Sequence, residues 1–583
     1  MPRKSFCEPI ETDVLIIGSG GAGLWAAIEA GQCGQRVIIL TKGTLGKCGA
    51  TLTAGADFNL DGHSIYRLFG FPADPRDSPE VLFEDTINIG GWINNQRIVE
   101  ALVDDAPQRV KELAGWGCRL EGLAMPARPG CQYPHGIMTT GVEISNVLVR
   151  EVKKLKQNVK IMDNTMVTDL LTDDGQVVGA IGLDTIRGTF VMFKAKAVVL
   201  ASGGGQEIFP IHTYPKEMSG DGQAMAYRAG AELLDMESMQ FLAMTFLHPY
   251  PPMSSRFVIL HLSNGAWLLN KHGQRFMNKW DLRNMEDTSR SMLAVAVNKE
   301  ILEGRGWTDE RGSYIALSMK HLPEDFIDQL SRNWYIRKCL FNKKSFDLLK
   351  RESMEAFIVP HSFQGGIRID ENGKTTVQAL FAAGEVTGGL HGADRLAGNA
   401  VTQCFVQGAR AGKAAAEFAA QNLSGRINNI QLESLYEKTF APLRRKNGVR
   451  PLEVRKKLQQ IASEKLINVR SDLALEKAIE EIDDLKTSLP LLSIRAKNSR
   501  YNREWILALE MENSILVAEM IARSALMRTE SRGNHYRYDF PAMDNKNWMK
   551  NIIIRRVGSK MDLNTDIPPA PTHFAKVVPG DDE

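Results

Sequence analysis

The sequence has no Cys-x-x-Cys pair and no uninterrupted apolar run near the length of a membrane-spanning helix. Its seven cysteines are scattered along 583 residues. This pattern predicts reduced, packed thiols and argues against a disulfide framework, an iron–sulfur cluster or a zinc site, so no metal site is expected. Residues 1–6 lack the apolar core of a secretory signal, so we expect neither secretion by that route nor a direct membrane span.

The sequence also lacks an excess of either charge and any repeat of fixed period. Lys and Arg number 71 and Asp and Glu number 69, which gives a formal net charge of +2. A charge balance of this kind creates no global field that would attract nucleic acid, so no nucleic-acid partner is expected. A chain of this length that is 43% hydrophobic can bury several cores, and we expect about two to four domains.

A glycine-rich turn lies near the start of the chain, between an apolar run at 13–17 and an Ala-rich helix expected at 24–30. A second apolar run at 36–41 completes a β-α-β unit. Glycines at a helix start let the backbone amides approach a pyrophosphate, so the order of these elements predicts dinucleotide binding. The position that usually carries an acidic ribose ligand holds Thr41 and Lys42 instead, which leaves the identity of the nucleotide open. The turn contains five residues expected at the nucleotide: Gly18, Gly20, Gly21, Ala22 and Gly23.

Two later segments return to the pattern of a buried strand followed by glycines, at 196–205 and at 377–389. The sequence between them reads as an inserted unit of mixed α and β character, and charged helix-forming segments follow it. The ending is extended and polar. These changes predict five segments: 1–235, the first part of the nucleotide-binding domain; 236–354, an inserted domain; 355–421, the second part of the nucleotide-binding domain; 422–540, a helical domain; and 541–583, a C-terminal segment.

Further motifs follow the glycine turn in a fixed order. They are Ala201–Gly204, Ser219–Gly222, Trp267–Met277, His361–Gly366, Gly384–Val386, His391–Asn399 and Arg528–Pro541. Together they resemble the flavoprotein subunits of succinate dehydrogenase and fumarate reductase, and their relatives L-aspartate oxidase and the α subunit of adenylylsulfate reductase. The resemblance covers nearly the whole chain. It implies an α/β fold in which a Rossmann-like FAD-binding domain carries an inserted α+β capping domain and a C-terminal helical domain.

The resemblance also implies that FAD is the cofactor. Succinate dehydrogenases place a histidine that bonds covalently to the flavin where this chain has Ala50, so we predict noncovalent FAD. Loss of that bond lowers the expected reduction potential of the flavin and makes succinate oxidation less favourable. We therefore expect either reduction of an acceptor or a different electron donor. Beyond the glycine turn, the residues that match FAD-binding positions are Thr41, Lys42, Gly49, Ala50, Thr51, Ala201, Gly203, Asp221, Glu385, Arg395, Asn399 and Ala400.

The family's chemistry is a hydride exchange between flavin N5 and a substrate carbon, with a side chain that moves a proton at the neighbouring carbon. Arg290 matches the arginine that shuttles this proton. His361 and Arg395 match ligands of the substrate carboxylate, and His248 resembles a third. Two of these residues also have an ordinary structural interpretation: Arg290 lies at an expected helix start, where arginine is often a solvated or capping residue, and His361 lies in an expected loop. The match of His248 is less direct, because the spacing before it differs from the family's by about two residues.

A second departure lies in the capping domain. The family's Thr-Glu-Gly segment, which binds a carboxylate and continues the proton relay, aligns with Val258, Ile259 and Leu260. Two hydrocarbon side chains remove both functions, so we expect either a less polar substrate end at this point or a polar contact from His261 or Ser263 instead.

Three functions stay open at this stage. The first is an oxidoreductase of the fumarate reductase type that acts on a small carboxylic acid and exchanges electrons with a separate iron–sulfur subunit. The second is a flavoenzyme like L-aspartate oxidase, which uses no such subunit, or like adenylylsulfate reductase, with a different substrate. The third is a noncatalytic electron-relay subunit. The expected localisation is cytoplasmic, with attachment to a membrane through partner subunits as an alternative.

Overall fold

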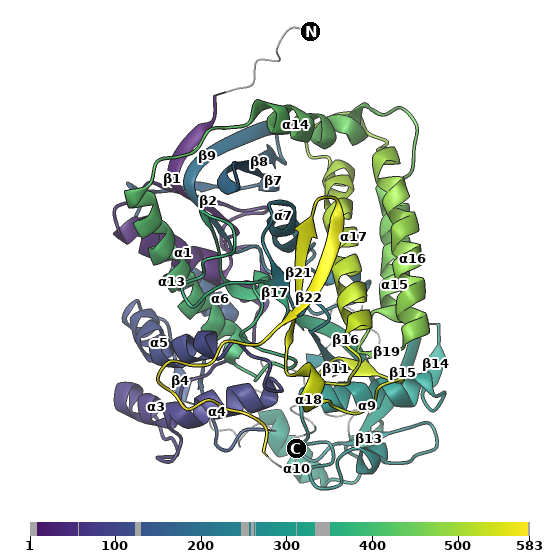
Figure 1. Ribbon diagram of the computed structural model, residues 1–583. Coiled ribbons are helices and arrows are strands. Elements are labelled where there is room, and N and C mark those ends of the chain that lie inside the picture. Colours follow the sequence, from purple (N-terminus) through teal and green to yellow (C-terminus); the bar gives the residue numbers. More distant parts are fainter. Residues whose placement is uncertain are drawn as a thin grey trace.

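The computed structural model describes residues 8–55, 57–122, 130–245, 256–257, 262, 264–310, 312–332 and 350–580. Its central element is a seven-stranded sheet with the strand order β6-β2-β1-β9-β8-β7, in which β18 pairs with β9. Figure 1 shows this sheet at the top of the molecule. Its strands are β1 (Ile10–Ile17), β2 (Val37–Leu40), β6 (Val159–Met162), β7 (Thr165–Asp173), β8 (Gln176–Asp184), β9 (Thr189–Leu200) and β18 (Leu380–Ala382).

The part of this sheet around β1 is parallel, and its register places Leu15 beside Ile38 on one side and Val198 on the other. Strands β7 and β8 are antiparallel to their neighbours. Residues Val14 to Ile17 are buried on both faces, as expected for a parallel strand that helices cover. The strand–turn–helix–strand order predicted from the sequence is therefore present.

Two helices, α1 (Gly21–Gln32) and α13 (Asn399–Gln421), pack closely beside this sheet. A Cβ at Gly408 would lie 2.5 Å from the carbonyl oxygen of Ala22, so only glycine permits this approach. Helix α1 begins three residues before the expected start at Leu24, because the glycine turn itself adopts helical geometry from Gly21.

Two antiparallel sheets lie below. The first has the order β17-β10-β21-β22 and the second the order β12-β11-β16-β15-β13, with β14 on β15. Helices α9 (Arg290–Leu302) and α10 (Glu324–Arg332) accompany the second sheet. The strands are β10 (Leu233–Leu234), β11 (Met239–Thr245), β12 (Arg256–Phe257), β13 (Trp267–Leu269), β14 (Trp307–Asp309), β15 (Gly312–Ser318), β16 (Met354–Phe363), β17 (Gly366–Ile367), β21 (Asn551–Val557) and β22 (Lys560–Asp566).

Helices form the flanks of the molecule, with α15 to α17 along the right side of Figure 1 and α3 to α5 at the lower left. In the described part of the chain, no helix is long and apolar enough to cross a membrane. The remaining helices of at least eight residues are α3 (Gly62–Phe69), α4 (Pro79–Ile89), α5 (Gln96–Gly115), α6 (Gly141–Lys154), α7 (Asp221–Arg228), α14 (Asn429–Arg444), α15 (Pro451–Lys465), α16 (Asp472–Ser488) and α17 (Arg503–Met527).

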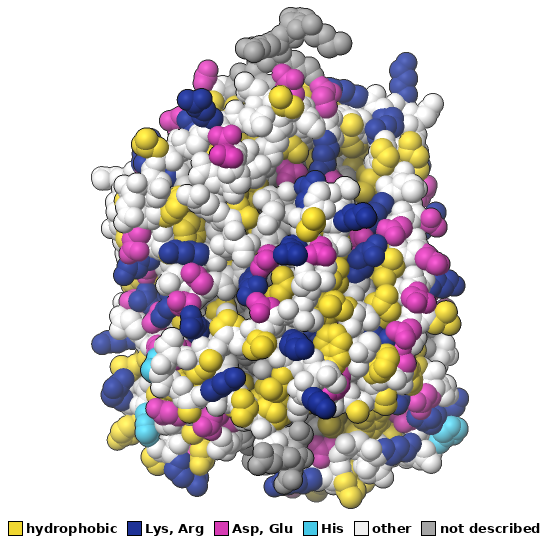
Figure 2. All heavy atoms as spheres, viewed as in Figure 1, with side chains coloured by type: hydrophobic (Ala, Val, Ile, Leu, Met, Phe, Trp, Pro, Cys, Tyr) yellow, Lys and Arg dark blue, Asp and Glu magenta, His cyan; other side chains and the backbone are white. Residues whose placement is uncertain are grey.

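The end of the chain folds back across the molecule. After the β21–β22 hairpin, residues 567–580 run without regular secondary structure toward α4 and α5 (Figure 1). Glu100 on α5 accepts hydrogen bonds from the backbone amides of Thr572, His573 and Phe574, and the Phe574 ring stacks on Phe83 at 4.6 Å. Acidic and basic side chains are interspersed on the face in Figure 2, in keeping with the near balance of charge.

Candidate functional site

A cavity with about 910 Å³ of empty space, part of it open to solvent, lies at the carboxyl ends of β1, β2 and β9 and at the start of α1. This is where open α/β sheets bind their ligands. The cavity brings together thirteen of the residues predicted from the sequence: Gly18, Gly20, Gly21, Ala22, Thr41, Lys42, Gly49, Ala50, Thr51, Ala201, Gly203, Asp221 and Glu385.

The three glycines of the turn serve two different purposes. A Cβ at Gly18, where φ is +112°, would lie 2.2 Å from the carbonyl oxygen of Ala201, and one at Gly23 would lie 2.0 Å from that of Gly18. These two glycines are needed by the fold itself. At Gly20 the nearest protein atom to such a Cβ is Thr51 Oγ1 at 3.6 Å, so the space that glycine keeps open there belongs to the cavity.

A charge network borders the cavity at Lys42 and Asp221, which both line it. Lys42 Nζ lies 2.9 Å from Asp221 Oδ2 and 2.5 Å from Glu510 Oε1, and Asn513 Nδ2 donates to Asp221 Oδ1 at 2.7 Å. Burial opposes the charge on Lys42, but the two carboxylates more than offset it and raise its pKa. Glu510 and Asn513 lie on α17, far along the chain, and no sequence pattern connected them with Lys42.

Glu385, which also lines the cavity, accepts hydrogen bonds from two sides. Its carboxylate accepts from the Phe363 amide at 2.9 Å and from Gln206 Nε2 at 2.6 Å. Burial raises the pKa of Glu385 to about 7 even though these donors oppose the shift. The carboxyl group therefore titrates near neutral pH.

Beside Glu385, the structure brings three predicted residues from separate segments into one electrostatic environment. His361 comes from β16, Arg395 from the loop before α13, and Arg290 from the first position of α9. Burial, followed by the nearby charges of Arg395 and Arg290, lowers the pKa of His361 well below its usual value, so its ring is neutral. Thr213 Oγ1 lies 2.7 Å from His361 Nδ1.

Arg395 is held rigidly. Its Nη2 donates to Gln240 Oε1 at 2.8 Å and its Nε to Ser362 Oγ at 3.3 Å. The neighbouring Asp394 accepts from the Arg395 amide at 2.8 Å and from the Ser291 amide at 3.2 Å. One carboxylate thus ties the start of α9, which carries Arg290, to the loop that carries Arg395.

The other predicted residues lie elsewhere. Gly23 packs within the turn, and Asn399 and Ala400 begin α13 outside the cavity lining. Asn399 Nδ2 donates to Thr86 Oγ1 at 3.1 Å. His248 lies outside the described residues, as do the predicted substitutions at 258–260 and their alternatives His261 and Ser263. The sequence reasoning did not name Ser202 as a site residue, although it lies within the Ala201–Gly204 motif. It also missed lining residues with no motif of their own: Cys48, Thr165, Met166, Val167, Glu217, Met218 and Cys404.

The cavity suits a dinucleotide. Gly20 leaves room for a pyrophosphate beside the turn, and the cavity lies at the N-terminus of α1, where the helix dipole favours an anion. The Ser202 hydroxyl lines the cavity and is buried with no hydrogen-bond partner among the described residues, as expected of a ligand contact. Fold and cavity together define a dinucleotide-binding protein.

Comparison with known proteins extends this assignment. The family profile described as "FAD binding domain" matches residues 13–401, and the profile described as "Fumarate reductase flavoprotein C-term" matches residues 455–581. The chain is 38% identical to one of the subunits of fumarate reductase (CoM/CoB) from Methanothermobacter marburgensis, over 94% of this chain and 98% of the relative. It is 30% identical to a fumarate reductase flavoprotein subunit of Mycobacterium tuberculosis, over 93% of this chain and 94% of the relative.

A solved structure of quinol fumarate reductase from E. coli superposes with a TM-score of 0.84 at 26% identity, over 98% of this chain and 99% of that one. The chain belongs to the family of fumarate reductase and succinate dehydrogenase flavoproteins. It is an FAD-dependent oxidoreductase, and the fold class and cofactor predicted from its sequence are confirmed.

Proposed function

We propose that this chain transfers hydride between FAD and a small unsaturated or saturated carboxylic acid, in the manner of a fumarate reductase. The observation that carries the proposal is the convergence of Arg290, His361 and Arg395 next to the FAD cavity. The guanidinium groups of the buried Arg395 and the half-buried Arg290 suit a carboxylate ligand. The bound FAD would supply the hydride chemistry.

We assign separate roles to the three side chains. Arg395, fixed by Gln240 and Ser362, would hold a substrate carboxylate. His361 is neutral and hydrogen-bonds to Thr213 through Nδ1, and we assign its ring to the same substrate carboxylate. Arg290 at the start of α9 would deliver the proton to the carbon next to the one that receives hydride.

The remaining FAD contacts belong to the same proposal. Gly20 and the first amides of α1 would face the pyrophosphate, and Glu385 would face the ribityl region. Since the chain has Ala50 where a covalent histidine is found in succinate dehydrogenases, the FAD would be bound noncovalently.

We also infer a separate electron-transfer partner with iron–sulfur clusters. The relatives' names call them subunits, and the match to the fumarate reductase (CoM/CoB) subunit covers 94% of this chain and 98% of that relative. Electrons would then enter or leave the flavin through another chain.

Anaerobic stopped-flow spectroscopy tests the proposal. The FAD-loaded protein is reduced chemically and mixed with fumarate, and reoxidation is followed by flavin absorbance. Arg290→Ala should slow reoxidation by about 10²- to 10⁴-fold, the usual contribution of a general acid, with FAD content unchanged. Arg283→Ala removes an exposed arginine near the same helix start and is the matched control.

A reducible wild-type protein that neither fumarate nor less polar unsaturated acids oxidise, and that succinate does not reduce, would refute the proposed substrate class. Rapid reoxidation by air or turnover with L-aspartate in that case would favour the aspartate oxidase pattern. Equal rates in wild type and Arg290→Ala would refute the role given to Arg290.

A further inference from the structure

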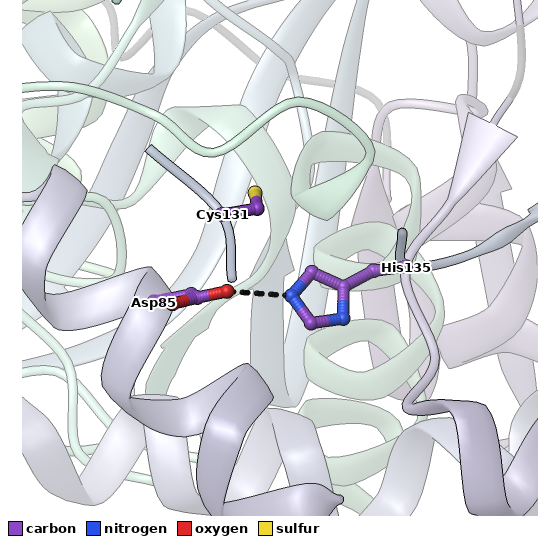
Figure 3. A group of neighbouring side chains, drawn as sticks. All are labelled: Asp85, Cys131 and His135. Atoms are coloured by element: carbon purple, nitrogen blue, oxygen red, sulfur yellow. Dashed lines mark hydrogen bonds and ion pairs between the residues drawn. The ribbon is translucent and has the colours of Figure 1, made fainter. Parts of the chain in front are cut away.

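A buried cluster of metal-ligand side chains lies outside the FAD cavity. Asp85 projects from α4, while Cys131 and His135 come from the segment that precedes β5 (Ile137–Met138) (Figure 3). None of the three lines the cavity. The spacing of Cys131 and His135 alone is not a zinc-binding motif, so the sequence predicted no metal here. The third side chain, Asp85, lies 46 residues before Cys131 and is brought close by the fold.

The donor atoms converge on one point. His135 Nε2 lies 2.8 Å from Asp85 Oδ2, and these two atoms and Cys131 Sγ all lie within 4.8 Å of one another. In a tetrahedral zinc site with metal–ligand bonds of about 2.0 to 2.3 Å, neighbouring donors lie about 3.3 to 3.8 Å apart. Small side-chain rotations would therefore bring the three atoms around one ion.

A fourth side chain, that of Asp77, contacts the other ring nitrogen of His135. Asp77 Oδ2 lies 3.0 Å from His135 Nδ1 and accepts from the Gly62 amide at 2.7 Å. A carboxylate on one imidazole nitrogen commonly orients the other nitrogen toward a metal. Asp77 is fully buried, and its Oδ1 has no hydrogen-bond partner among the described residues.

The charges of the cluster also permit a cation. A divalent ion would take the places of the protons on His135 Nε2 and on the Cys131 sulfur, which leaves the net charge of the cluster, ion included, unchanged. Binding would therefore add no uncompensated charge to a site where the His135 and Asp85 side chains are 1% and 2% exposed.

We propose that Asp85, Cys131 and His135 bind one divalent transition-metal ion. One thiolate, one imidazole and one carboxylate form a mixed donor set that suits zinc, with the fourth position left for water. Asp77 is a positioning residue for His135. The ion would link the segment at 130–136 to α4. Thr86, which follows Asp85 on α4, accepts a hydrogen bond from Asn399 at the start of α13.

Metal analysis of the full FAD-loaded chain tests this proposal. The protein is purified without a metal-affinity tag, incubated with Zn²⁺, and exchanged into metal-free buffer before mass spectrometry. We expect about one zinc per chain in the wild type and in Cys33→Ser, which removes an exposed thiol. Cys131→Ser and His135→Gln should each lose this zinc, and Asp77→Asn should bind it about 10- to 100-fold more weakly.

Two measurements keep the test independent of protein folding. In Co²⁺-loaded wild type, a thiolate-to-cobalt absorption band should appear, and Cys131→Ser should lack it while it keeps one FAD per chain. In wild type, bound zinc should protect Cys131 from alkylation until a chelator is added. If the wild type takes up no zinc, or if zinc and the cobalt band persist in Cys131→Ser, the cluster is an ion-paired histidine only and the proposal is wrong.

Discussion

Replacement of Gly20 by alanine should weaken FAD binding while it leaves the fold intact. The backbone at Gly20 has φ −70° and ψ −174°, which alanine adopts without strain. The nearest protein atom to the new Cβ would be Thr51 Oγ1 at 3.6 Å, an ordinary van der Waals distance. The methyl group would instead enter the space in which we place the pyrophosphate.

The size of the effect follows from this geometry. Excess volume in a packed site costs about 1 to 3 kcal/mol, which corresponds to a Kd for FAD raised by about 5- to 150-fold. Gly18→Ala gives the contrasting result, because its Cβ would lie 2.2 Å from the Ala201 carbonyl oxygen and would disrupt the fold. Gly115→Ala, at an exposed glycine with no atom within 4 Å, is the neutral control.

Fluorescence titration of the flavin-free protein with FAD measures these constants, and circular dichroism reports folding. If Gly20→Ala binds FAD as tightly as wild type, the pyrophosphate does not lie at this turn. If Gly20→Ala unfolds like Gly18→Ala, the division of the turn into fold glycines and a cofactor glycine is wrong.

Three further predictions concern the cofactor bond, pH and the end of the chain. Because Ala50 cannot bond to flavin, acid precipitation should leave all of the FAD in the supernatant, and flavin in the pellet would contradict this. Burial, followed by repulsion from Glu237, raises the pKa of Asp235 to about 7. The folded protein thus holds the Asp235 proton more tightly than the unfolded chain, in which the pKa is about 4. This stabilises the fold fully below pH 4, and the contribution is lost as pH rises to about 7. Asparagine tolerates the positive φ of 49° at this position, so Asp235→Asn should keep the backbone. Its free energy of unfolding, relative to wild type, should rise by about 3 kcal/mol between pH 5 and pH 8. The difference in Tm between the two proteins should therefore grow with pH, and a constant difference would count against the pKa shift. Glu100→Gln removes the charge that holds the amides at 572–574, so limited proteolysis should cut residues 567–580 faster than in the exposed control Glu84→Gln, and equal rates would show that the carboxylate is dispensable.

Much of the nucleotide-binding half could be predicted because its signals are local. The apolar run before Gly18, the glycine turn and the run at 36–41 each depend on neighbouring residues, and a strand, a turn and a helix form from such neighbours. The start of α1 was misplaced by three residues, since a glycine has no side chain to reveal whether it ends a turn or begins a helix.

The family motifs supplied the candidates Arg290, His361 and Arg395, but sequence order says nothing about their distance in space. Their convergence depends on how α9 packs against the loop before α13, through Asp394 and the Ser291 amide. A contact of this kind depends on the closure of long chain segments and on the packing of whole elements.

The sequence by itself determined the dinucleotide-binding β-α-β unit, because a strand, a turn and a helix form from neighbouring residues. Its motifs, through their resemblance to a known family, supplied the family, the full fold class and FAD as the cofactor. Only the tertiary structure decided that Glu510 pairs with Lys42, and that Asp85 meets Cys131 and His135. Those side chains come from segments far apart in the sequence. Their meeting is set by the burial of apolar surface across the whole molecule, and no local pattern records it.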